Sequence, residues 1–325
     1  MRVAVVGCGR IGNKRVQALG ESRLVAVADV DPARAQALAA AHPGCVASGD
    51  WRSVVGRDDV ELVIVATTND WLTPVALAAI ERGKHVLVEK PAARSAAELK
   101  PLMAAARTRG VTVKVGFNHR FHPAFLKARA LFGENAIGAL MYIRARYGHG
   151  GRLGYEREWR ADPAVAGGGE LLDQGVHLID LSRWFMGDFA EVEGHLATFF
   201  WKMPVEDNAF LCLRTAHGQT AWLHASCTEW KNLFSFEIFG REGKLQIDGL
   251  GGSYGAERLT YHRMLPEMGP PETTAWDYPA EDSSWRDEYR HLVSCIRAGR
   301  PPSGGLEDAL AALEVIGRVY GREGA

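Results

Sequence analysis

Three residues that could handle a proton during catalysis stand at two places in the chain. Asp173 and His177 are four residues apart in GGGELLDQGVHLID (167–180), a spacing that puts both side chains on one face of a helix. A histidine titrates near neutral pH and can accept a hydroxyl proton, and a carboxylate one turn away can orient the imidazole or the substrate. Lys90, in the tripeptide EKP (89–91), follows an apolar run and can donate to a substrate oxygen. These groups predict acid–base chemistry on an alcohol or a carbonyl.

Each of these residues also has a plainer structural interpretation. Lys90 could be a surface lysine paired with Glu89. Asp173 and His177 could be a stabilising pair within a helix, or half of a metal site. No third cluster of ligand residues with a recognisable spacing accompanies them, so we expect no metal.

A glycine-rich loop near the N-terminus has the pattern of a dinucleotide site. Gly7, Gly9 and Gly12 form a G-x-G-x-x-G motif between an apolar run and a helical segment. The first glycine permits a tight turn, the second lets the backbone approach a pyrophosphate, and the third lets helix and strand pack closely. The free amides at the start of the helix would bind the phosphates, with Arg10 and Ile11 in its first turn.

An acidic residue follows at the spacing that a ribose-binding carboxylate needs. Asp29 stands 29 − 7 = 22 residues after the first glycine, at the end of the second apolar run. Its carboxylate would accept the adenosine ribose hydroxyls and repel a 2′-phosphate, so we expect NAD rather than NADP. Arg34, one helical turn on, is the main argument for NADP. Asp29 could instead cap the helix that begins near Pro32, although Asp31 is better placed to do so.

Composition and charge narrow the class of protein. The chain has 325 residues, of which 38 are basic and 39 acidic, and its formal charge of −1 argues against a general binder of nucleic acid or anionic membranes. The five cysteines are scattered, with no Cys-x-x-Cys, which favours a reducing cytoplasm. No run approaches the ~18 apolar residues of a membrane span, and the N-terminus reaches glycines too soon for a signal peptide.

Apolar runs alternate with alanine-rich segments over residues 1–120. Each run is apolar throughout, as expected for a parallel strand that is covered on both faces. The runs are 3–6, 24–28, 62–66, 86–88 and 111–115, and the helical segments between them include 31–41, 72–82 and 95–109. This βαβ series predicts an α/β Rossmann domain with a doubly wound parallel sheet over residues 1–120.

Residues 121–325 have a different texture and predict an α+β domain with a large, mainly antiparallel sheet. The pattern predicts hairpins, a helix and a final helix that could pack back on the first domain. The hairpin strands are 211–215 with 220–223 and 236–239 with 244–247, and the helices are 170–185 and 306–320. Aromatic strands at 197–201 and 221–224 could cover an exposed face, so we expect a homodimer or homotetramer.

Ordered motifs along nearly the whole chain resemble the glucose–fructose oxidoreductase and inositol dehydrogenase (Gfo/Idh/MocA) family. They are GCGRIG, VAVADVDPARA, TTNDWLTPVALAAIERGKHVLVEKP, VGFNHRFHP, GGGELLDQGVHLIDLSRWFMGD and FGREGKLQI. The resemblance implies that Lys90, Asp173 and His177 are catalytic and that the second domain's sheet forms the oligomer interface. It also implies that the segment 67–70 lines the nicotinamide together with Glu89. Gln174 stands where many members carry an apolar residue, a departure without consequence for catalysis.

The resemblance and the motifs together give a set of candidate binding residues. The cofactor candidates are Gly7, Gly9, Arg10, Ile11, Gly12, Asp29, Thr67, Asn69, Glu89 and Lys90. The substrate candidates are Lys90, Asn118, Arg120, Arg152, Tyr155, Trp159, Asp173 and His177.

An arginine-rich segment bears on the substrate. Residues 144–160 carry five arginines with Tyr155 and Trp159 between them, and guanidinium groups grip phosphates while aromatic faces stack on sugar rings. Equally, the segment could be the solvent side of a strand followed by an ordinary loop. With the family's preference for polyols, it suggests a sugar, nucleotide sugar or cyclitol whose secondary hydroxyl is oxidised or whose ketone is reduced.

Three other functions use parts of the same pattern. An NAD-dependent glycosidase or lyase of this family, with no net redox change, would use the same residues. A methyltransferase shares the glycine loop but has no use for Lys90 and the Asp173–His177 pair. A non-catalytic NAD sensor would not need the acid–base residues at all.

Overall fold

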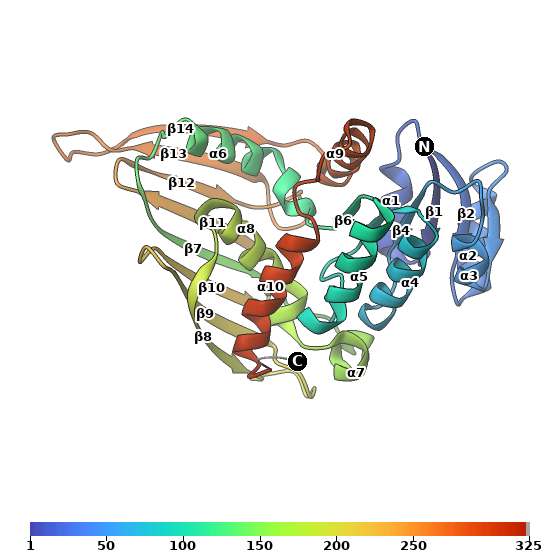
Figure 1. The fold of residues 1–325 in the computed structure, drawn as a ribbon. Helices are drawn as coiled ribbons and strands as arrows, with labels where there is room; N and C mark the ends of the chain where they lie inside the picture. The colour runs from blue at the N-terminus through green and yellow to red at the C-terminus, as the bar shows by residue number, and fades with distance from the viewer. Residues whose placement is uncertain (323–325) are drawn as a thin grey trace.

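The apolar runs near the N-terminus form a six-stranded parallel sheet in the computed structural model, which describes residues 1–322 (Figure 1). Its order is β3-β2-β1-β4-β5-β6, so β2 and β3 are added on one side of β1 and β4 to β6 on the other, and the strand order reverses between β1 and β4. The strands are β1 Arg2–Val6, β2 Arg23–Ala28, β3 Val46–Ser48, β4 Leu62–Val65, β5 His85–Val88 and β6 Val113–Val115. In such a sheet, ligands bind outside the carboxyl ends of the strands at this switch point.

Helices cover both faces of the parallel sheet. They are α1 Arg10–Gln17, α2 Pro32–Ala40, α3 Trp51–Val55, α4 Asn69–Glu81 and α5 Ala96–Arg109. The side chains of Asp31, Asp50 and Ser95 cap α2, α3 and α5, which explains where these helices begin. The doubly wound fold predicted from the sequence is confirmed, although β3 and α3 are too short to leave a periodic pattern.

The second sheet has eight strands in the order β14-β13-β12-β11-β7-β10-β9-β8. Every neighbouring pair is antiparallel except β7 with β10. The strands are β7 Leu140–Gly148, β8 Phe189–Ala197, β9 Asn208–Thr215, β10 Thr220–Ser226, β11 Leu233–Gly240, β12 Gly243–Asp248, β13 Glu257–Arg263 and β14 Glu272–Tyr278. The two predicted hairpins are confirmed as β9–β10 and β11–β12.

The predicted strand at 197–201 is wrong. β8 ends at Ala197, and the next residues form a loop around the carboxylate of Asp207. That carboxylate accepts hydrogen bonds from the backbone N–H groups of Phe199, Phe200 and Trp201. These amides therefore bind a side chain instead of pairing with a neighbouring strand. The aromatic side chains of Phe199 and Phe200 are exposed in this loop.

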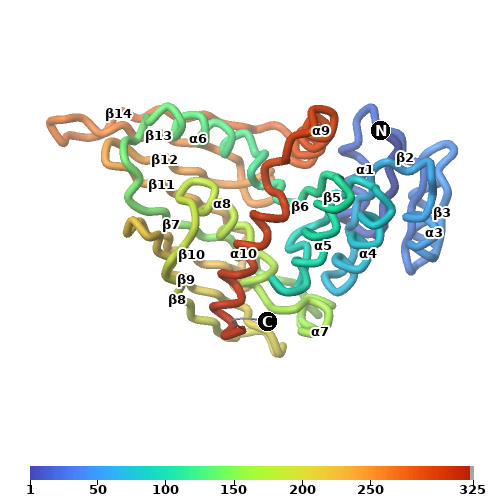
Figure 2. The backbone as a smooth tube through the Cα atoms, in the orientation of Figure 1, coloured from blue at the N-terminus to red at the C-terminus, as the bar shows by residue number. Residues whose placement is uncertain are grey.

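The remaining helices bring the two sheets together (Figure 1). They are α6 Pro123–Gly133, α7 Pro163–Ala166, α8 Val176–Met186, α9 Ser284–Ala298 and α10 Leu306–Val319. α6, α8 and α10 pack on one face of the eight-stranded sheet, while α10 also contacts α5 and α9 contacts α1. Figure 2 shows the chain returning after β14 through α9 beside the parallel sheet, and then through α10 between the two sheets.

The boundary between two domains after residue 120 stays a proposal. It falls inside the 3-10 turn Asn118–Phe121, which follows β6. Residues 323–325, the last of the proposed second domain, lie outside the described residues. Within residues 1–322, no helix has both the length and the apolar character needed to cross a membrane.

Candidate active site

The glycine loop has the shape that a pyrophosphate requires. Gly7 has a φ of +95°, and a Cβ there would lie 2.3 Å from the carbonyl oxygen of Ala66. A Cβ on Gly12 would lie 1.9 Å from the carbonyl oxygen of Gly7, so the third glycine allows the helix to pack on the loop. A Cβ on Gly9 would meet nothing within 4 Å. Because no side chain caps the start of α1, its first amides and the open space at Gly9 fit a bound dinucleotide.

The carboxylate of Asp29 is held against this loop. Its Oδ2 accepts a hydrogen bond from the backbone N–H of Cys8 at 2.6 Å, and its Oδ1 accepts one from the N–H of Asp31 at 2.9 Å. Asp31, not Asp29, caps α2. Arg34 lies 3.1 Å from Asp31 in an exposed ion pair. The geometry therefore fixes the Asp29 carboxylate beside the glycine loop, and its role toward a ribose stays a prediction.

Lys90 and Asp173 are in contact although Lys90 follows a strand of the parallel sheet and Asp173 lies in the helical turn before α8. Lys90, just after β5, places its Nζ 2.5 Å from Asp173 Oδ1 and 2.5 Å from the Asp173 carbonyl oxygen. Arg160 Nε lies 3.2 Å from the other carboxylate oxygen, Oδ2. Burial raises the pKa of the Asp173 carboxyl, but the charges of Lys90 and Arg160 outweigh burial and hold that pKa below its usual range. Asp173 is therefore an ionised anchor between two cations.

The helical segment that carries Asp173 and His177 begins with a π-helical turn, and the two residues contact different partners. Residues Leu171–Gly175 form one π-helical turn before α8 begins at Val176. Asp173 binds Lys90, whereas the His177 ring stacks on the ring of His119, with centroids 3.8 Å apart and planes 17° apart. The sequence placed the carboxylate and the imidazole on one helix face, and the structure gives each its own partner.

His177 lies in a buried environment close to the positive charge of Lys90. It is 4% exposed, and within the described chain its Nδ1 is buried without a hydrogen-bond partner. Burial lowers the pKa of the imidazole well below its ordinary value, and the nearby charge of Lys90 lowers it further. The ring is therefore unprotonated at neutral pH and free to accept a proton.

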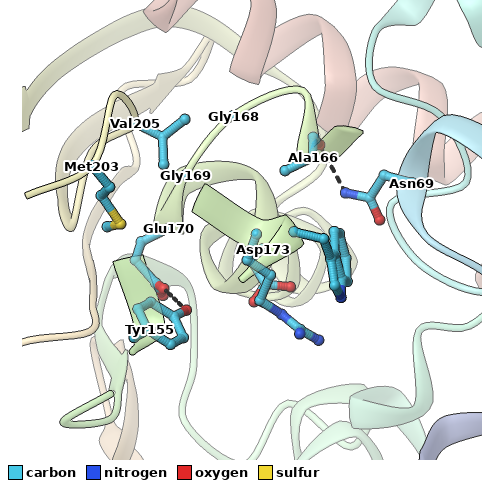
Figure 3. A pocket seen from close by; sticks show the side chains of 11 residues that line it. Asn69, Tyr155, Ala166, Gly168, Gly169, Glu170, Asp173, Met203 and Val205 are labelled. Atoms are coloured by element: carbon cyan, nitrogen blue, oxygen red, sulfur yellow. Dashed lines mark hydrogen bonds and ion pairs between the residues drawn. The ribbon is translucent and has the colours of Figure 1, made fainter. Parts of the chain in front are cut away.

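A second carboxyl group, Glu170, stands in a pocket beside Asp173 (Figure 3). Its Oε1 accepts a hydrogen bond from the hydroxyl of Tyr155 at 2.9 Å and lies 3.7 Å from His149 Nε2. Burial and the negative charge of Asp173 raise the pKa of Glu170 to about 8. Two carboxyl groups on one helical turn thus differ in charge at neutral pH, one ionised and one protonated. The pocket is lined by Asn69, Tyr155, Trp159, Arg160, Ala166, Gly168, Gly169, Glu170, Asp173, Met203 and Val205.

Comparison with known proteins decides what kind of site this is. Residues 1–117 match the family model of the oxidoreductase family with an NAD-binding Rossmann fold, and residues 125–246 match the GFO/IDH/MocA C-terminal domain. The chain belongs to the Gfo/Idh/MocA family of oxidoreductases. The resemblance seen in the motifs, the fold class, the redox chemistry and the NAD cofactor are thereby confirmed.

Individual relatives agree with this assignment. The dTDP-3,4-didehydro-2,6-dideoxy-alpha-D-glucose 3-reductase of Streptomyces antibioticus is 31% identical over 76% of this chain and 75% of its own. Levoglucosan dehydrogenase of Pseudarthrobacter phenanthrenivorans is 30% identical over 61% of this chain, and the match spans only 58% of that protein's length. A structure of levoglucosan dehydrogenase with NADH and levoglucosan shares the fold, with a TM-score of 0.88, 23% identity, and coverage of 99% of this chain and 96% of that one.

Several residues expected at the site of this oxidoreductase do line the pocket. Tyr155 and Trp159 are among the lining residues, as is Asn69, whose Nδ2 donates to the carbonyl oxygen of Ala166 at 2.8 Å. Thr67 lies two residues before α4 begins, and its hydroxyl donates to the carbonyl oxygen of Thr68. Arg10 and Ile11 form the first turn of α1.

Other expected binding residues make contacts that would position the site. The Glu89 carboxylate, next to Lys90, is buried against Arg15 at 2.5 Å. Asn118 donates to the Ser284 hydroxyl at 2.9 Å. Arg120 forms an ion pair with Asp180 of α8, and the exposed Arg152 forms one with Glu158. Their roles toward cofactor and substrate remain proposals.

The candidate site residues did not include three residues that the fold brings together with Asp173 and His177, although Arg160 was noted as one of the five arginines of 144–160. His119 stacks on His177, Arg160 binds Asp173, and Glu170 is the protonated neighbour of Asp173. All three stand within motifs that were noticed, but their role depends on the meeting of distant segments. No local spacing could have indicated it.

Proposed function

We propose that this oxidoreductase transfers a hydride between NAD and a carbon that bears a secondary hydroxyl in a sugar, nucleotide sugar or cyclitol. The observation that carries the proposal is the Lys90–Asp173 ion pair with the buried His177 beside it. Lys90 lies at the carboxyl edge of the parallel sheet, where the glycine loop would present the nicotinamide.

The residues divide the work of oxidising an alcohol. NAD, when bound, supplies the acceptor for the hydride that leaves the carbon. The ammonium group of Lys90 donates a hydrogen bond to the substrate oxygen, and Asp173 holds that ammonium group in place. His177 takes the proton of the hydroxyl group as its O–H bond breaks and the carbonyl bond forms. In the reverse direction His177 returns the proton.

The pocket supports a sugar-like substrate. Asn69, Arg160 and Glu170 line the pocket with polar groups suited to hydroxyls, and Trp159 adds an aromatic side chain, whereas the Tyr155 ring is buried against His149 and Trp201. Arg144 and Arg152, which the sequence suggested for phosphates, form ion pairs with glutamates. The names of the relatives above, a nucleotide-sugar reductase and an anhydrosugar dehydrogenase, support the same substrate class.

We also infer a homodimer or homotetramer in a reducing cytoplasm. Tyr142 of β7 and Trp222 of β10 are 40% and 58% exposed on the face of the eight-stranded sheet that faces away from α6, α8 and α10. The same face carries the ion pairs of Glu237 with Arg144 and Lys244, and exposed aromatic side chains among such charges favour pairing with a second copy. All five cysteines are free thiols, which supports a reducing compartment.

The test is to incubate the purified protein with NAD and a panel of sugars, nucleotide sugars and cyclitols. We expect NADH to accumulate with a member of this panel, as followed by its absorbance. His177→Ala should lower turnover roughly 100- to 10,000-fold and leave NAD affinity nearly unchanged, since a general base contributes that much. The exposed His217→Ala serves as the matched control. Product without NADH would indicate a glycosidase or lyase and contradict the proposal.

A further inference from the structure

Two buried imidazole rings lie face to face, and the charge of Lys90 acts on both of them. The rings of His119 and His177 are 3.8 Å apart and nearly parallel, and the two residues are 5% and 4% exposed. Both Nδ1 atoms are buried without a hydrogen-bond partner among residues 1–322. Burying two polar rings in contact costs free energy, so the arrangement requires a reason beyond packing.

The turn that carries His119 is fastened on both sides. Arg120 donates to both carboxylate oxygens of Asp180, at 2.8 and 2.6 Å, and Asp180 follows His177 by one turn of α8. Asn118 is tied to Ser284 of α9. The neighbours of His119 thus fix the 3-10 turn against the helix that carries His177, and the two rings have little freedom to move apart.

The stack is surrounded by groups that decide its charge. The Lys90 charge and His122 disfavour a proton on His177, whereas Asp173 favours one. His122 itself lies 2.9 Å from Glu257, and the ring of Tyr147 covers the edges of both imidazoles. Burial and then the charge of a protonated His177 lower the pKa of His119 well below its ordinary value. His119 therefore stays neutral when His177 gains a proton.

We propose that His119 is a positioning residue whose neutral ring face orients His177 and stabilises the positive charge that His177 acquires when it accepts the substrate proton. A cation over an aromatic face is attracted to it, more strongly where water is excluded. The inference rests on the proposed function, because it assumes that His177 is the proton acceptor. In this inference the aromatic face of His119, and not its nitrogens, supports the protonated His177.

Two substitutions separate the face from the nitrogens. His119→Phe keeps a flat aromatic ring and removes both nitrogens, whereas His119→Leu removes the ring. Exposed His195, on β8, provides the control substitution His195→Leu. The readouts are kcat and KM for sugar oxidation with NAD, and the pKa of the His177 imidazole followed by NMR titration of the NAD complex.

We expect His119→Leu to lower kcat roughly 2- to 30-fold, the range for loss of one cation–aromatic contact, with little change in KM. The His177 pKa should fall in this variant, because its charged form loses its support. His119→Phe and the control should stay close to the wild type. If His119→Leu fails to fold, His119→Met, which is also non-aromatic, is measured in its place.

Two results would overturn the inference. One is a non-aromatic variant that matches the wild type in both kcat and the His177 pKa. The other is a His119→Phe variant whose kcat falls as much as that of His119→Leu and whose KM rises. That result would show that a His119 nitrogen binds substrate. Failure of the proposed function has a different signature, since the wild type would then form no NADH while the NMR comparison would still report on the stack.

Discussion

Replacing Glu170 by glutamine should change how the stability of this oxidoreductase depends on pH. Burial and the charge of Asp173 raise the Glu170 pKa from 4.5 to about 8. A carboxyl group whose pKa is raised on folding contributes its stability below its unfolded pKa, and that contribution is lost as pH rises through the folded pKa. The loss should therefore occur between about pH 4.5 and about pH 8.

The size of the effect follows from the size of the shift. One pKa unit corresponds to about 1.4 kcal/mol, so the shift of Glu170 corresponds to roughly 3 to 5 kcal/mol of unfolding free energy. Glutamine keeps the shape and cannot ionise, and it can still accept from the Tyr155 hydroxyl. We expect Glu170→Gln to gain roughly that much relative to the wild type as pH rises from about 5 to about 9.

The assay is urea unfolding of both proteins at a series of pH values, with the difference in unfolding free energy plotted against pH. The exposed Glu193→Gln on β8 serves as the control, and its difference curve should be flat. Parallel stabilities of the wild type and Glu170→Gln across this range would refute the argument that the buried carboxyl is protonated in the folded protein.

Three further outcomes follow from the site and the sheet. Asp29→Ala should narrow or reverse the preference for NAD over NADP in calorimetric titrations; tighter binding of NADP by the wild type would show that the role given to Asp29 is wrong. Lys90→Ala should lower turnover about as much as His177→Ala, and the double variant should be little worse than either, because both groups act on one proton transfer. A double variant whose loss of turnover equals the combined losses of the two single variants would show that Lys90 and His177 act independently. Light scattering at micromolar concentration should show a dimer or tetramer that Trp222→Glu weakens, whereas a monomeric wild type would remove the proposed interface.

Much of the fold was accessible from the sequence because it depends on local pattern. Buried parallel strands need apolar residues on both faces, and the run 62–65 is fully buried as β4. The glycine loop was predictable because a Cβ at Gly7 or Gly12 would clash with backbone, so the local geometry demands glycine. Asp29 follows from its spacing to this loop.

The parts that escaped prediction depend on contacts between distant segments. The loop at 199–201 has the aromatic composition of a strand, but the Asp207 carboxylate captures its amides. The π-helical turn that separates Asp173 from His177 leaves no signature in residue type. The partner of His177 comes from a turn that is fastened by the Arg120–Asp180 pair, and such a pair cannot be read from spacing.

The central claim is hydride transfer between NAD and a carbon of a sugar-like substrate. It is tested most directly in the reductive direction, with NADH that carries deuterium at the transferable position and a panel of keto sugars, followed by mass spectrometry of the product. The account predicts one deuterium per product molecule, on a carbon that bears a secondary hydroxyl, and loss of this transfer in His177→Ala. A converted sugar without deuterium, with the label still on the cofactor, would contradict it.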